Sequence, residues 1–323
     1  MNLRVIGSLL FMGFGLGSTS PLLAQQKGQY VPGQYGLNAG LGIQPDPGFT
    51  FANITINYSA SSFKNSNGNS VPVTGTYGFW AVESIFMYAS PAKILRGQFT
   101  SMAALNAANA SVTADLTPAQ FGINGGGEGM GDTWVQPVNL GWHLKRVDTW
   151  VGYAFMAPTG KYFPLASNNI GSGYWGNNFA TGTTFYVSKN KGTQLNLATN
   201  WEFHGQKRDT NITPGQAFTD EWGLGQILPL KKDLSRLLQL GVVGYDQWQV
   251  SANQGLTSGA PYYSRHAIGF QTNFIAPAKA LTLFFKYEPE YLAKASPQGR
   301  NIVFGFAWTL RDPKPKASNW HQG

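Results

Sequence analysis

The chain has 323 residues and a formal net charge of +8; 12% of its residues are charged, 14% are aromatic and none is cysteine. An average soluble domain has about a quarter charged residues, so this composition is atypical of a soluble protein. The lack of cysteine excludes disulfides, cysteine-bound metals and thiol nucleophiles. The basic residues, such as Lys189, Lys207 and Arg208, fall in expected turns and loops rather than on one face. This spread argues against a nucleic-acid partner and favours contact with anionic outer-membrane lipid.

Residues 1–24 have the pattern of a cleaved secretory signal peptide. Arg4 supplies the positive charge, an apolar stretch follows from Val5 to Leu16, and Ala24 is a small residue before a cut at Gln25. A retained N-terminal membrane helix is the alternative. After residue 24 no run reaches the roughly 20 apolar residues of a spanning helix, so an exported chain of this kind crosses a bilayer only as a β-barrel.

Residues 25–47 do not alternate and are rich in Gly, Gln and Pro. We expect them to be a disordered leader, a periplasmic segment or a plug folded into the barrel lumen. Residues 48–311 are expected to form an outer-membrane β-barrel. Residues 312–323 contain Pro313 and Pro315 and are expected to be a periplasmic tail.

From residue 48 onward, apolar and polar side chains alternate over runs of about eleven residues. In the run 194–204, Leu195, Leu197 and Trp201 share one face, and Asn196 and Asn200 share the other. A tilted strand needs about nine to eleven residues to cross a bilayer, which is longer than a usual soluble strand. The sequence therefore predicts an all-β fold, an up-and-down antiparallel transmembrane barrel of about twelve strands, at 49–61, 77–90, 95–112, 132–144, 147–157, 174–188, 192–205, 216–228, 236–250, 262–275, 279–293 and 300–311.

The connections between these strands alternate in length. Odd-numbered connections, such as 62–76 and 158–173, are mostly long and polar, whereas even-numbered ones, such as 145–146, are mostly short. Outer-membrane barrels have long extracellular loops and short periplasmic turns, and an even strand number closes the sheet without an edge. We therefore expect both chain ends on the periplasmic side of the outer membrane of a Gram-negative bacterium.

Alternation also predicts which side chains face the lumen. Trp80 and Val82 oppose Glu83, and Ile54 and Ile56 oppose the neighbouring asparagines. Charges at mid-strand are expected to point inward, because a lysine facing lipid at the bilayer midplane costs about 2 to 4 kcal/mol. The candidates either line an open lumen or hydrogen-bond one another in a filled one. They are Asn53, Asn57, Glu83, Asn196, Asn200, Glu202, His204, Glu221, Gln247, Gln271, Lys286, Glu288 and Glu290.

Enzyme and cofactor motifs are weak in this sequence. A lipid hydrolase would need a Ser–His pair near the outer rim, and only His204 and His266 approach that end. The run Gly125–Gly131 lacks the lysine and helix of a phosphate-binding loop, so we interpret it as a flexible loop. Pro137 predicts a bulge or a strand end. We predict no enzymatic activity, cofactor or metal site.

Several strings resemble proteins of the phenol-degradation meta-pathway family. They are Tyr30-Val31-Pro32-Gly33-Gln34-Tyr35-Gly36-Leu37-Asn38-Ala39-Gly40, then Gly131-Asp132-Thr133-Trp134-Val135-Gln136-Pro137, and Gly152-Tyr153-Ala154-Phe155-Met156-Ala157-Pro158-Thr159-Gly160-Lys161-Tyr162. The resemblance implies an outer-membrane barrel that assists uptake of hydrophobic or aromatic compounds. It is closest up to about residue 162 and loosest in the later loops.

Together, these features predict a channel or transporter-like barrel for passive uptake of small hydrophobic or aromatic solutes. A structural or surface-interaction barrel with a filled lumen is the alternative, and a lipid-modifying enzyme is a third hypothesis. The sequence leaves the oligomeric state open.

Overall fold

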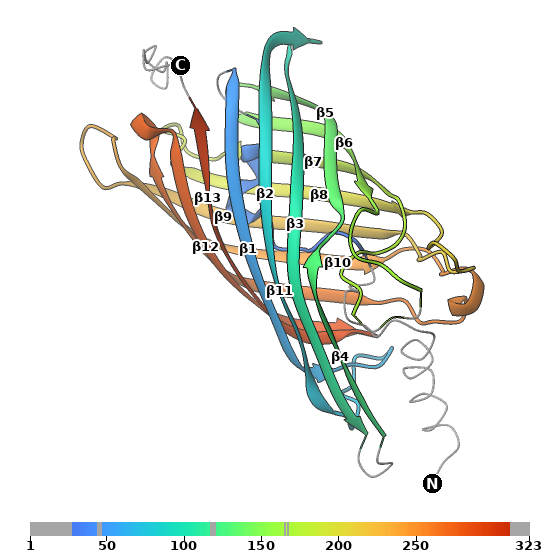
Figure 1. Cartoon of the computed structure of the whole chain (residues 1–323). Helices are drawn as coiled ribbons and strands as arrows, with labels where there is room; N and C mark the ends of the chain where they lie inside the picture. Colours follow the sequence, from blue (N-terminus) through green and yellow to red (C-terminus); the bar gives the residue numbers. More distant parts are fainter. Residues whose placement is uncertain (1–27, 44–46, 117–120, 165, 167, 311–323) are drawn as a thin grey trace.

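The computed structural model describes residues 28–43, 47–116, 121–164, 166 and 168–310. Within these residues, thirteen antiparallel strands form one sheet, in which neighbours along the chain are paired except β4 and β5, both of which pair with β3. Because β1 pairs with β13 as well as with β2, the sheet closes into a barrel (Figure 1). The strands are β1 (Gly48–Phe63), β2 (Thr74–Ile94), β3 (Gly97–Leu116), β4 (Phe121–Met130), β5 (Thr133–His143), β6 (Val147–Ala157), β7 (Gly176–Tyr186), β8 (Thr193–His204), β9 (Ala217–Pro229), β10 (Leu237–Gln249), β11 (Ser264–Ala276), β12 (Leu281–Lys294) and β13 (Pro297–Leu310).

The wall has twelve strand positions, because β4 and β5 lie one after the other along β3. Gln98–Ala104 of β3 pair with β5, and Ala107–Leu116 of β3 pair with β4. The prediction of an up-and-down antiparallel barrel of about twelve strands is therefore confirmed. The signal peptide expected at residues 1–24 and the tail expected at 312–323 lie outside the described residues.

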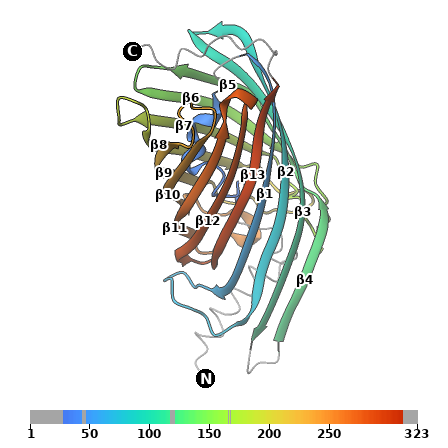
Figure 2. The ribbon, with the colours of Figure 1, turned by 90° about the vertical axis from the view of Figure 1, so that its left-hand side faces the viewer.

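Short connections gather at one rim of the barrel and long ones at the other. The rim where β1 begins and β13 ends carries the connections 95–96, 144–146, 187–192, 230–236 and 277–280, and we call it the short-turn rim. The opposite, long-loop rim carries the connections 64–73, 158–175, 205–216 and 250–263, with a short one at 295–296. β2 has 21 residues and β3 has 20, whereas β6 and β7 have 11 each. Figures 1 and 2 show that β2, β3 and β4 make one side of the barrel taller than the rest.

The outer surface is largely apolar, as a lipid-facing surface requires. Trp80, Phe179, Leu224 and Phe270 are each at least half exposed, and all lie on that surface. The described residues include no helix that is both long enough and apolar enough to cross a membrane.

The glycine-rich run near β4 corrects one expectation. We expected Gly125–Gly131 to be a flexible loop, but Gly125, Gly126 and Gly127 are paired with β3 opposite Val112, Ser111 and Ala110. Glycines have no side chains that could alternate, so this strand carries no period-2 signal in the sequence.

The bulge expected at Pro137 is confirmed, because the register between β5 and β6 shifts between Val135 and Val138.

Two carboxylates correct the expectation that all mid-strand charges point inward. Asp220 of β9 lies opposite Asp246 of β10, on the outer face that also carries Leu224. Asp246 accepts a hydrogen bond from Trp222 Nε1 at 3.2 Å and lies 2.6 Å from His266 Nδ1. These partners reduce the cost of the outward carboxylate of Asp246.

Candidate functional site: the barrel lumen and its N-terminal segment

Residues 28–43 run through the inside of the barrel, and we call them the N-terminal segment. Their one regular element is the 3-10 helix η1 (Gly36–Gly42), which contacts β6, β7, β8, β9 and β10. In Figures 1 and 2 this segment, coloured blue, lies within the ring of strands. Of the three locations expected for residues 25–47, the structure places the described part in the lumen; residues 25–27 and 44–46 lie outside the described residues.

Glu221 of β9 is the main attachment point of this segment. Its Oε1 accepts hydrogen bonds from the backbone N of Gly33 at 3.0 Å and of Gln34 at 3.1 Å, and from the Tyr30 hydroxyl. Its Oε2 accepts one from the Tyr35 backbone N at 2.7 Å. The side chain is 1% exposed. Hydrogen bonds to an ionised acceptor are stronger than neutral ones, so this carboxylate fixes the turn at residues 33–35.

Other wall residues hydrogen-bond further backbone groups of the segment. Glu202 of β8 accepts hydrogen bonds from the backbone N of Gln29 and of Tyr30, at 2.8 and 3.1 Å. The carbonyl groups of the segment accept hydrogen bonds from donor side chains of the wall. Lys286 Nζ donates to Gly33 O, Asn301 to Pro32 O, Gln247 to Tyr30 O, and Trp150 Nε1 to Ala39 O. Backbone that forms no sheet must find such partners when it is buried.

Glycines let the segment approach the wall closely. Gly33 has φ +93° and Gly36 has φ +55°, a backbone region that L side chains rarely adopt. A Cβ atom on Gly33 would lie 2.5 Å from Glu288 Oε2, and one on Gly36 would lie 2.5 Å from Gln271 Oε1. Any larger residue at these two positions would therefore adopt a strained backbone conformation, and it would force either the segment or the facing end of Glu288 or Gln271 to shift.

The opposite side of the lumen is apolar, and we call it the apolar wall. Its buried members are Ile54, Ile56, Tyr58, Ala60, Tyr77, Phe79, Ala110, Phe284 and Val303. The rings of Tyr58 and Phe79 are stacked with their centroids 5.7 Å apart. Val31 of the N-terminal segment and Ile170 of the connection 158–175 pack against this wall. The lumen thus has a polar side that holds the segment and an apolar side that the segment only touches.

The connection 158–175 is fixed to the rim and to the segment through Asp132. Asp132 lies between β4 and β5 and accepts hydrogen bonds from Gly160 N at 3.0 Å and Ser172 N at 2.8 Å. Burial raises the pKa of this carboxyl group, and the two donors act in the opposite direction. Gln29 Nε2 donates to the Ser172 hydroxyl at 2.7 Å, so the same loop also holds the start of the N-terminal segment.

The structure places most of the predicted lumen residues inside the barrel. Those that point inward are Glu83, Asn196, Asn200, Glu202, His204, Glu221, Gln247, Gln271, Lys286, Glu288 and Glu290. Glu202, Glu221, Gln247, Gln271 and Lys286 bond the N-terminal segment directly. Glu290 instead accepts hydrogen bonds from Tyr58, Tyr245 and Gly299 of the wall.

Asn53 and Asn57 are corrections, because both face outward. Asn57 lies opposite Trp80, which is 52% exposed, and Asn53 donates a hydrogen bond to Ser84 Oγ at 3.3 Å on the same outer face. The inward residues of β1 are Ile54, Ile56 and Tyr58. Alternation separates two faces of a strand, but it does not say which face meets lipid when the lumen is itself partly apolar.

Sequence reasoning missed other residues that hold the segment. Trp150 is fully buried, and its ring edge lies against Gly42 and Gly182. Asn139 donates to Gly42 O, and Asn273 donates to the Asn38 side chain at 2.8 Å. Asn139 and Asn273 lie among the inward residues of their strands, and the alternation of the sequence could have identified them. Trp150 could not be identified in this way, because a large apolar side chain is expected to face lipid.

The two histidines near the long-loop rim are each paired with a carboxylate of the barrel. Both ring nitrogens of His204 are occupied, because Nε2 lies 2.9 Å from Glu202 Oε2 and Nδ1 lies 2.8 Å from Gly215 O. His266 is paired with Asp246 and lies against the ring of Trp248. A general base needs a free nitrogen directed at a nucleophile, so His204 is a structural residue.

Comparison with known proteins agrees with the barrel. An outer membrane channel from Pseudomonas putida F1 has a similar structure, with a TM-score of 0.69 and 14% identity over 87% of this chain and all of that one. The beta domain of the Bordetella autotransporter BrkA has a TM-score of 0.50 and 12% identity over 82% of this chain and all of that one. No curated protein matches the sequence. These structures share the outer-membrane type of barrel. A family model matches residues 60–306, and the chain therefore belongs to the family described as "Putative MetA-pathway of phenol degradation".

Proposed function

We propose that the protein is an outer-membrane channel for passive uptake of small hydrophobic or aromatic compounds, exported by a cleaved signal peptide at residues 1–24. Family membership and the barrel support a channel or transporter role. The observation that carries the solute class is the apolar wall, which places Ile56, Tyr77 and Phe79 in a lumen that is otherwise polar. An apolar solute gains free energy on such a surface in proportion to the apolar area that it covers.

A structural or surface-interaction barrel with a filled lumen is the second candidate. The observation that favours it is the N-terminal segment, whose hydrogen bonds to Glu202, Glu221 and Lys286 occupy the middle of the barrel. The two candidates differ in flux: a channel raises the rate at which solute enters the cell, and a filled structural barrel does not.

Uptake by whole cells separates the two. The protein would be expressed in a Gram-negative host that lacks its own uptake barrels, and entry of labelled naphthalene would be compared with that of labelled glucose. We expect the protein to accelerate naphthalene entry. Ile56→Asn should lower that rate about ten-fold, because a polar group on an apolar path costs on the order of 1 to 3 kcal/mol.

Ile56→Leu is the matched control, since it keeps an apolar side chain of the same size and should keep the rate. If naphthalene enters no faster than in cells without the protein, the second candidate is correct. If Ile56→Asn and Ile56→Leu transport equally well, the apolar wall is not the path.

A further inference from the structure

The outer surface of β1, β2, β3 and β13 changes from apolar to polar along its height. Toward the short-turn rim it carries large apolar residues, including Phe86 of β2, Leu105 of β3 and Phe304 of β13. Toward the long-loop rim the same strands carry only small or polar residues in the outward positions. Ser59 lies opposite Gly78, and Gly78 lies opposite Ser111, so three small residues form one row across three strands.

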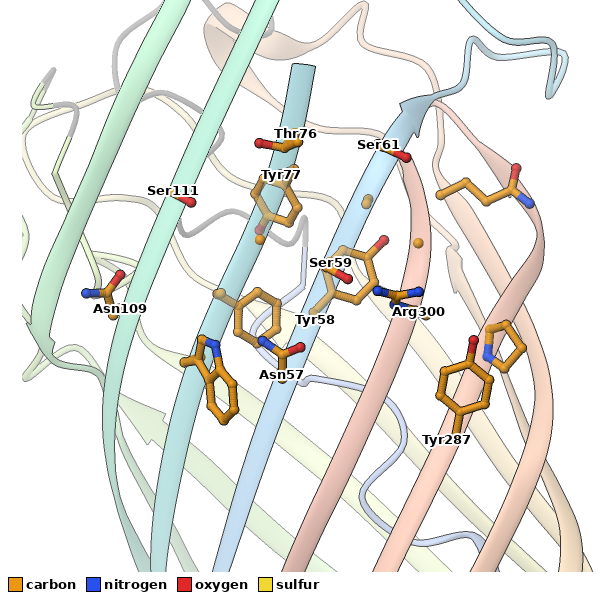
Figure 3. A pocket seen from close by; sticks show the side chains of 17 residues that line it. Asn57, Tyr58, Ser59, Ser61, Thr76, Tyr77, Asn109, Ser111, Tyr287 and Arg300 are labelled. Atoms are coloured by element: carbon orange, nitrogen blue, oxygen red, sulfur yellow. The ribbon is translucent and has the colours of Figure 1, made fainter. Parts of the chain in front are cut away.

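A recess of about 550 Å³ lies over this row. Asn57, Trp80 and Asn109 form the row next to it, on the side of the short-turn rim. Tyr287 and Arg300 close it on the side of β12 and β13. Figure 3 shows these side chains around the recess, with Arg300 beside Ser59.

Arg300 gives the recess a positive charge. Its side chain is exposed, and it lies opposite Ser59 on β1 and Pro289 on β12. Within the part of the chain that the structure describes, no carboxylate forms an ion pair with it. Glu128 of β4 accepts a hydrogen bond from Asn109 Nδ2 at 3.3 Å at the edge of the recess, but β3, β2 and β1 lie between it and β13, which carries Arg300. An unpaired guanidinium in a hollow of hydroxyl and amide groups is suited to a phosphate.

The recess lies at the height of a membrane boundary, which we assign to the outer side because outer-membrane barrels carry their long loops outside the cell. Tyr88 and Trp80 are both exposed on the outer face of β2 and are eight residues apart. Eight residues of strand span about 27 Å, or roughly 20 Å along the membrane normal at a tilt of about 40°, which approaches the height of the apolar band of such barrels, about 25 Å. Tyr88 and Trp80 thus occupy the two interfacial belts where aromatic rings concentrate.

We propose that this recess binds the phosphorylated sugar headgroup of a glycolipid in the outer leaflet of the outer membrane. Arg300 pairs with the phosphate, and Asn57, Ser59 and Asn109 hydrogen-bond the sugar. Trp80 and Tyr287 lie at the boundary between sugar and acyl chains. A lipid fits better than a free phosphosugar, because the apolar face toward the short-turn rim is continuous with the recess and accommodates acyl chains. The proposal is independent of the solute that the lumen carries.

Binding of purified bis-phosphorylated lipid A to the refolded full chain in detergent tests this proposal. Arg300→Gln should weaken binding about ten-fold, as expected for loss of a charged hydrogen bond. Ser59→Trp should abolish binding by filling the recess, and an outward tryptophan at this height is compatible with folding. Lys294→Gln is the matched control, because it removes an exposed cation from the same rim outside the recess. Heat-dependent mobility on a gel verifies that each variant is folded.

Equal affinity of the parent, Arg300→Gln and Ser59→Trp would overturn the proposal. So would equally tight binding of dephosphorylated lipid A, which would leave Arg300 without a role. If inorganic phosphate displaces lipid A at a similar concentration, the recess binds anions and not a lipid. Weaker binding in both recess variants, with unchanged binding in Lys294→Gln, would support the proposal.

Discussion

Releasing the N-terminal segment is the most direct test of how the lumen is occupied, and Glu221→Gln is the change to make. The carboxylate accepts hydrogen bonds from the backbone N atoms of Gly33, Gln34 and Tyr35, and from the hydroxyl of Tyr30. A glutamine keeps one oxygen but turns an NH2 donor toward one set of these donors, and it removes the charge. Each charged hydrogen bond has a net value of about 1.5 to 3 kcal/mol.

A loss of about 3 kcal/mol in docking free energy is therefore a conservative estimate for Glu221→Gln. Every 1.4 kcal/mol corresponds to a factor of ten, so the population with an undocked segment should rise roughly 100-fold. Because the chain contains no cysteine, Gln34→Cys introduces a single thiol on the segment. Its rate of maleimide labelling in the folded barrel reports the undocked population.

Glu290→Gln is the matched control. Glu290 is also buried and accepts three hydrogen bonds, which come from Tyr58, Tyr245 and Gly299 of the wall rather than from the segment. Labelling should accelerate in Glu221→Gln and stay near the parent rate in Glu290→Gln. Equal labelling in all three proteins, or equal acceleration in both variants, would refute the assignment of Glu221 as the attachment point.

Gly36→Ala should accelerate the same labelling about ten-fold, because its Cβ would lie 2.5 Å from Gln271 Oε1 at a φ of +55°; an unchanged rate would mean that the segment shifts without cost. Val31→Ala should raise naphthalene uptake without raising ion conductance, and higher conductance would show that it opens the whole lumen. Burial lowers the pKa of Lys207 to about 8. Below that pH the buried lysine is charged, and its charge destabilises the folded state. The free energy of unfolding should therefore rise as the pH increases from about 8 to 10.5. Lys207→Met should remove this rise, by up to about 3 kcal/mol in guanidinium unfolding; a parallel pH profile would contradict it.

The strands were predictable because lipid imposes a strong rule on them. A wall one strand thick with lipid on one side forces apolar and polar side chains to alternate over about eleven residues. β6 illustrates this rule, because it begins and ends where the sequence predicts, at residues 147 and 157. β4 was missed for the complementary reason: its glycines pair through backbone atoms alone, and backbone pairing leaves no pattern of side chains.

The inward face of a strand was predictable where polar residues line the lumen, although Asp220 and Asp246 show that a charge alone does not identify that face. Lys286 and Glu288 mark the inward phase of β12 without ambiguity, because both charges are costly in lipid. β1 has no charged residue within the predicted run 49–61, and its inward phase is apolar because it lines the apolar wall. The location of the N-terminal segment was open for a related reason: its attachment uses the backbone N–H groups of residues 33–35, which every sequence has.

The division of the lumen into two sides has a consequence for how a solute passes. The polar side holds the N-terminal segment through hydrogen bonds that an apolar solute cannot replace, so solute does not displace the segment from Glu221. On the apolar wall, Val31 is the segment residue that packs against the buried cluster, and a few apolar contacts are all that a solute must exchange there. An apolar molecule exchanges them at little net cost, whereas a hydrated ion loses water on that wall and gains no partner. Under the proposed function, we therefore propose that a segment docked on one side only keeps the barrel closed to ions and leaves a path for apolar solutes between Val31 and the apolar wall.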